Sequence, residues 1–64
     1  MHLVAFTRTP AGLFKIYDQG TDWQIIGLGF ERWCSVWSTD RAASLKRAIS
    51  LIPNAVDVTY LSGK

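Results

Sequence analysis

Residues 30–38 (FERWCSVWS) predict a strand that carries large apolar side chains on both of its faces. Side chains alternate between the two faces of a strand. One face therefore carries two tryptophans, Trp33 and Trp37, and the other carries a more compact apolar set, Phe30, Cys34 and Val36. A fold that contains this strand must cover both faces with other parts of the chain, or expose one of them.

The residues before this strand predict an antiparallel meander. Residues 2–8 are rich in β-formers and nearly alternate between apolar and polar, and residues 13–18 and 23–28 predict two further strands. Turn sequences separate the three segments at 9–12 (TPAG) and 19–22 (QGTD). Gly27 and Gly29 either form a tight turn between two strands or mark a bulge in one long strand. We favour the turn.

The periodicity changes to that of a helix at residues 38–54 (STDRAASLKRAISLIPN). Ser38 or Thr39 can cap its start, with Asp40 in the first turn, and Pro53 ends it. The expected apolar stripe is Ala42, Leu45, Ala48, Ile49 and Ile52, and the opposite polar face is Arg41, Ser44, Lys46, Arg47 and Ser50. Residues 56–61 predict a last strand, with Val56, Val58 and Tyr60 on one face.

This order predicts a single small α+β domain spanning residues 1–64. We expect an antiparallel sheet of four to five strands (meander, then helix, then closing strand) with one helix packed on one face. One helix covers only one sheet face, and we expect it to meet Phe30, Cys34 and Val36. If the register is the opposite one, the tryptophans form the core and the exposed set is Phe30, Arg32 and Val36.

The composition argues against an enzyme or a metalloprotein. Cys34 is the only cysteine and His2 the only histidine, so the chain offers neither an internal disulfide nor the four Cys or His ligands of a structural zinc site. A nucleophile would have only His2 as its histidine base. We expect no catalytic residue, no metal and no cofactor, and we expect Cys34 to be a small buried apolar residue.

The longest uncharged apolar run, residues 25–30, is far shorter than the roughly 20 residues of a membrane helix. No secretory leader opens the sequence, and the lone cysteine fits a reducing compartment. We therefore expect no membrane partner and an intracellular, cytoplasmic location.

The expected activity is protein binding through the aromatic side chains that the helix leaves uncovered. Tryptophan, tyrosine and arginine are enriched among the residues that dominate binding energy at interfaces. The candidate partner-binding residues are Trp33, Trp37, Tyr60 and Arg32. The partner is either a second copy of the chain or a larger protein, which the chain would block as a small inhibitor or accessory factor of the kind that phages and mobile elements encode.

The alternative is a nucleic-acid-binding protein. Aromatic side chains of a sheet can stack on bases, and Arg41, Lys46 and Arg47 of the helix could contact phosphates or an acidic protein surface. The net charge is +2, and all of it lies in residues 39–64 (4 − 2 = +2), since residues 1–38 balance (3 − 3 = 0).

Two resemblances of layout accompany these hypotheses. The strand–helix–strand order of residues 36–63 is similar to that of small bacteriophage inhibitors of bacterial RNA polymerase. That family implies working arginines on the closing strand, where this chain has Val58, Thr59, Tyr60 and Leu61, so no functional residue carries over. The order of residues 13–52, strands and then a helix, is similar to that of DNA-binding modules of plant transcription factors and phage integrase arms. Those modules read DNA with a sheet rich in Arg and Trp, whereas this sheet region is neutral.

Overall fold

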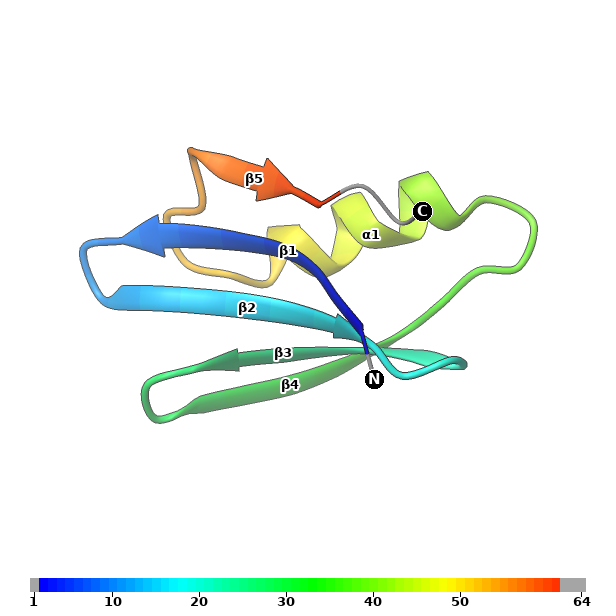
Figure 1. Cartoon of the computed structure of the whole chain (residues 1–64), viewed down its shortest axis with the longest axis horizontal. Coiled ribbons are helices and arrows are strands. Elements are labelled where there is room, and N and C mark those ends of the chain that lie inside the picture. Colours follow the sequence, from blue (N-terminus) through cyan, green and yellow to red (C-terminus); the bar gives the residue numbers. More distant parts are fainter. Residues whose placement is uncertain (1, 62–64) are drawn as a thin grey trace.

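The computed structural model describes residues 2–61. Its elements are β1 (His2–Thr9), β2 (Gly12–Asp18), β3 (Asp22–Gly27), β4 (Phe30–Ser35), α1 (Arg41–Ser50) and β5 (Val58–Tyr60). The strands form one five-stranded antiparallel sheet in the order β4-β3-β2-β1-β5 (Figure 1). The predicted α+β architecture is confirmed, and the closing strand pairs with β1, at the edge of the sheet far from β4.

The turns of the meander lie where the sequence predicts them. Pro10 and Ala11 connect β1 to β2 across the Thr9–Gly12 pair, and the Gln19 N–H donates to the Asp22 carbonyl at 3.0 Å in the next turn. Leu28 and Gly29 connect the paired residues Gly27 and Phe30, so these glycines form a turn and not a bulge. Gly29 has φ +67°, a conformation that glycine adopts at little cost.

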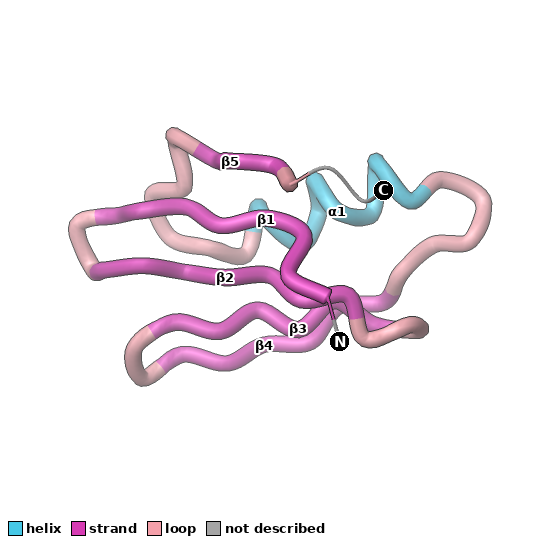
Figure 2. The backbone as a smooth tube through the Cα atoms, viewed as in Figure 1, coloured by secondary structure: helices cyan, strands magenta, loops and turns pink. Residues whose placement is uncertain are grey.

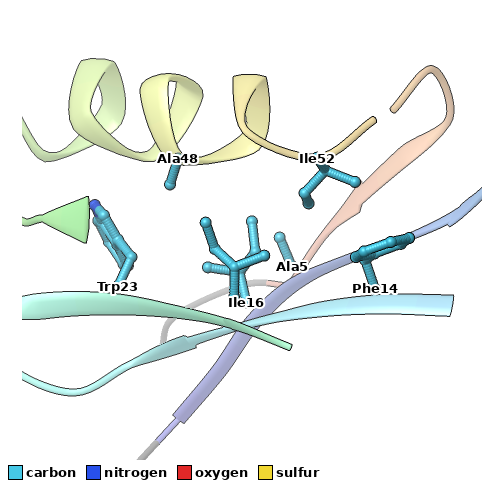
Figure 3. Close-up of a cluster of buried hydrophobic side chains, with 7 residues drawn as sticks. Ala5, Phe14, Ile16, Trp23, Ala48 and Ile52 are labelled. Carbon is cyan, nitrogen blue, oxygen red and sulfur yellow. The ribbon is translucent and has the colours of Figure 1, made fainter. Parts of the chain in front are cut away.

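The helix packs on one face of the sheet and encloses the hydrophobic core between the two layers (Figures 2 and 3). The core consists of five sheet residues, one helix residue and one residue from the turn after the helix, namely Ala5, Phe14, Ile16, Trp23, Ile25, Ala48 and Ile52. Phe30, Cys34 and Val36 pack against it while partly buried, which confirms the face of residues 30–36 expected to meet the helix.

The details of the helix differ from the prediction in three places. The N-cap is Asp40, whose carboxylate accepts from the Ala43 N–H at 3.0 Å, and not Ser38 or Thr39. Ser44, expected on the polar face, is fully buried, whereas Ala42, expected on the apolar stripe, is exposed.

The end of the helix and the start of the last strand also differ from the prediction. The helix ends at Ser50, so Ile52 reaches the core from the turn that follows it. Asn54 takes φ +59° at the exit. The last strand spans only Val58–Tyr60, and Val56 is exposed in the preceding loop.

Candidate functional site

The sheet face turned away from α1, hereafter the open face, is formed by every second residue of the strands. Residues directly opposite each other in a ladder share a face, and neighbours along a strand alternate. Because Ala5, Phe14, Ile25 and Phe30 pack in the core, the pairing assigns the intervening residues to the open face. In β1 to β4 they include Phe6, Arg8, Leu13, Lys15, Tyr17, Asp22, Gln24, Ile26, Glu31, Trp33 and Ser35.

Large apolar side chains of the open face contact solvent. Trp33 is 53% exposed, Leu13 41% and Ile26 37%, whereas Phe6 and Tyr17 are partly buried. They form lateral rows across the sheet. Tyr17, Gln24 and Trp33 are paired in one row, and Phe6, Lys15, Ile26 and Glu31 in the next. Aromatic and aliphatic groups thus extend over four strands with Lys15 among them.

A hydrogen-bonded chain of polar side chains borders Trp33. Gln19 Nε2 donates to Gln24 Oε1 at 2.6 Å, and Gln24 Nε2 donates to Glu31 Oε2 at 2.9 Å. Gln24 is directly opposite Trp33 in the ladder. This chain fixes Gln24 beside the indole and leaves the Trp33 ring itself exposed.

The charges of the open face in β1 to β4 balance. Arg8 and Lys15 lie on β1 and β2, and Asp22 and Glu31 lie on β3 and β4, which gives 2 − 2 = 0. Positive charge therefore gathers on one half of these four strands and negative charge on the other, with apolar groups between them. Nucleic-acid surfaces are instead expected to be basic overall.

The structure separates the four partner-binding residues expected from the sequence. Trp33 lies on the open face. Arg32 is opposite Ile25, on the face that bears the helix, with its guanidinium 5.7 Å from the Phe30 ring centre. Tyr60 is opposite Ala5 on that same face and belongs to the other edge strand, 55% exposed. Trp37, 43% exposed, lies in the loop between β4 and α1.

The three basic helix residues do not form one surface either. Arg41 Nη2 contacts Asp18 Oδ2 at 2.6 Å, and its guanidinium lies 5.1 Å from the Trp23 ring centre. Lys46 and Arg47 are exposed on the helix. Because α1 covers the opposite side of the sheet, one ligand segment lying on the open face does not reach Lys46 and Arg47.

Asp18 and its neighbours fix the start of the helix to the end of β2. The Gly20 N–H donates to Asp18 Oδ1 at 2.8 Å, and this bond, followed by the Arg41 guanidinium, holds the pKa of Asp18 below its usual value, while partial burial opposes them. Below the Arg41 side chain, the buried Trp23 indole N–H donates to Ser44 Oγ at 3.1 Å, and Ser44 Oγ donates to the Arg41 carbonyl. This group of side chains has a structural role.

Several open-face residues escaped the sequence-based site prediction, among them Phe6, Leu13, Lys15, Tyr17 and Ile26. These residues could have been found by alternating side chains between the two sheet faces along residues 2–8, 13–18 and 23–28 and pairing the strands across the two predicted turns. Such a pairing places Lys15 beside Phe6 and Ile26, as the structure does.

Within residues 2–61, no cluster of three or more His, Cys, Asp or Glu side chains is arranged to hold a metal ion. No helix in that range has the length and apolar character needed to cross a membrane. Comparison with known protein families, curated proteins and solved structures finds no match to the chain.

Proposed function

We propose that the chain is a non-enzymatic protein-binding module that docks through its open face on a larger protein and blocks the surface it covers. The observation that carries this proposal is that residues 2–61 contain one helix. It covers one face of a five-stranded sheet and leaves Trp33, Ile26 and Leu13 exposed on the other. Exposed apolar clusters with a polar rim mark interaction sites in soluble proteins.

The charges of the open face indicate the chemistry of the partner. Lys15, between Phe6 and Ile26, is surrounded by apolar groups, and Arg8 lies on the same half of the face. A complementary surface is apolar and carries carboxylates opposite Lys15 and Arg8. A phosphate backbone would instead meet Asp22 and Glu31 on the other half, which favours a protein over the nucleic-acid alternative.

The test compares two exposed aromatic residues on different faces. Trp33→Ala truncates the open face, and Tyr60→Ala is the matched control, since Tyr60 is exposed to nearly the same degree (55% against 53%) but lies on the other face at the other edge. Proteins captured from a cell lysate by the immobilised wild-type chain are quantified against both variants. The affinity of a captured protein is then measured with purified components.

We expect Trp33→Ala to cost about 2 kcal/mol or more of binding free energy, which is about a 30-fold loss of affinity. Ile26→Asp should give a similar loss, while Tyr60→Ala should bind like the wild type. Circular dichroism confirms that each variant is folded. Equal capture of proteins by the wild type, Trp33→Ala and Ile26→Asp would contradict docking through the open face. Binding of RNA or DNA to the purified wild-type chain at low salt would instead favour the nucleic-acid-binding alternative.

A further inference from the structure

The second unpartnered surface is the free edge of β4. β4 is the outermost strand on its side of the sheet, and among the described residues no element lies beyond it (Figure 1). It pairs with β3 from Phe30 to Ser35 without a bulge. Edge strands of natural proteins are usually shortened, bulged or blocked by proline, because their free backbone groups pair with other strands. β4 has none of these three devices, and the charged side chains of Glu31 and Arg32 are its only protection against pairing.

The backbone groups that β4 presents outward can be assigned. The Val36 N–H donates to the Thr21 carbonyl on the β3 side at 3.0 Å. In an antiparallel ladder this direction alternates, so Phe30, Arg32 and Cys34 also bond toward β3. Glu31, Trp33 and Ser35 therefore direct their N–H and C=O groups away from the sheet.

We infer that a second copy of the chain occupies this edge, and that β4 pairs with β4 antiparallel about a two-fold axis at Trp33. Only this register pairs all three outward residues within the strand: Trp33 with Trp33 of the second copy, and Glu31 with Ser35 twice. A two-fold axis at Glu31 or Arg32 would place like charges opposite each other. An axis at Cys34 would move Glu31 beyond the end of the paired strand.

Side chains in the inferred register are complementary. Arg32 is opposite Cys34 of the second copy, so neither charged residue of β4 faces a like charge. Gln24 binds Glu31 Oε2, so the other carboxylate oxygen can accept from the Ser35 hydroxyl of the second copy. The two Trp33 indoles lie side by side on the open face, where cross-strand aromatic pairs are favourable.

The pairing closes on itself. An isologous contact uses β4 of both copies, and the remaining edges are the β5 strands, which are only three residues long. The product is a dimer and not a growing sheet. The axis is perpendicular to the sheet, so both open faces lie on one side and both helices on the other. This inference is independent of the docking proposal, because a monomer can still dock through its open face.

The test measures the association state of the purified full chain by sedimentation equilibrium over the micromolar to millimolar range. We expect a reversible dimer. Ser35→Pro removes an outward N–H that the monomer does not use, at an edge position that tolerates proline. By symmetry it removes two bonds of the dimer, and we expect the dissociation constant to rise about tenfold or more. Ser35→Ala is the matched control: it keeps the outward N–H and loses only the hydroxyl, so its dissociation constant should rise much less than that of Ser35→Pro.

Charge variants test the register and do not depend on the folding of the proline variant. Ser35→Glu faces Glu31 of the second copy and should weaken the dimer, while Glu31→Lys combined with Ser35→Glu should restore it. A monomer at every concentration overturns the proposal and leaves the edge to a strand of another protein. A dimer that Ser35→Pro and Ser35→Glu both leave unchanged overturns pairing through β4, and failure of the double variant to restore the dimer overturns the register.

Discussion

Single residues of this chain have roles that their chemical type alone does not reveal. Ser44 is polar and lies in a helical segment, yet it is fully buried because its hydroxyl accepts from the Trp23 indole and donates to the Arg41 carbonyl. Helical periodicity predicts a serine on the solvent face, because the prediction considers the polarity of the side chain and not its hydrogen-bond partner. The partner is 21 residues earlier in the chain, so only the tertiary fold identifies it.

Gly27 shows the same dependence on a distant partner. A Cβ atom at this position would overlap the ring of Phe14, which packs directly over the backbone of β3. We expect Gly27→Ala to lower the free energy of unfolding by about 1–3 kcal/mol, the usual cost of forcing extra atoms into a packed core. Denaturant titration measures this loss.

A double-mutant cycle provides the control for Gly27→Ala. Phe14→Leu removes the ring, so we expect the double variant to be more stable than the sum of the two single losses predicts. Additive losses, or a Gly27→Ala variant as stable as the wild type, would contradict the steric explanation.

At the scale of elements, the sequence predicted the existence and type of each strand and of the helix, but not their ends. The turns were predictable because Pro10, Gly20 and Gly29 have specific conformational preferences. The last strand was predicted too long because Val56 has the composition of a strand residue, whereas the pairing with β1 begins only at Val58, opposite Thr7. Strand ends depend on the partner strand, which local composition does not specify.

The start of the helix permits a direct test of which residue caps it. Asp40 accepts from the Ala43 N–H, and substitution of such a cap by alanine costs about 0.5–2 kcal/mol. We expect Asp40→Ala to lose stability in that range by denaturant titration. Thr39→Ala is the matched control, and it should stay within about 0.5 kcal/mol of the wild type. A larger loss of stability for Thr39→Ala than for Asp40→Ala would show that Thr39 is the N-cap, as the sequence also allowed.

At the scale of the whole molecule, the sequence predicted that one helix leaves one sheet face uncovered, and Phe30, Cys34 and Val36 face the helix as expected. It did not predict which residues share the uncovered face. Trp33 and Tyr60 seemed equivalent as exposed aromatic residues, but the order β4-β3-β2-β1-β5 places them at opposite edges and on opposite faces. Strand order is set by long-range pairing, and alternation within single strands does not encode it.

The attachment of the helical layer to the sheet is expected to depend on pH through Asp18. The Gly20 N–H and the Arg41 guanidinium both favour its carboxylate, so its pKa is lower in the folded chain than in the unfolded chain. The stabilisation is therefore complete above the unfolded pKa of about 3.9 and is lost as the pH falls through the folded value. We expect the stability difference between wild type and Asp18→Asn to be largest near neutral pH and to shrink on acidification.

Denaturant titrations of both chains at several pH values down to about 2 measure this difference. Arg41→Gln separates the two partners of Asp18. It removes the guanidinium but keeps the Gly20 N–H, so the pH dependence that Asp18 contributes should be reduced in this variant but not abolished.

Because the Asp18–Arg41 ion pair joins the end of β2 to the first turn of α1, its loss should loosen the helical layer while the β1–β2 ladder stays paired. Hydrogen exchange at low pH would then show faster exchange in α1 than in β1, and equal protection of the two elements would place the effect of Asp18 elsewhere.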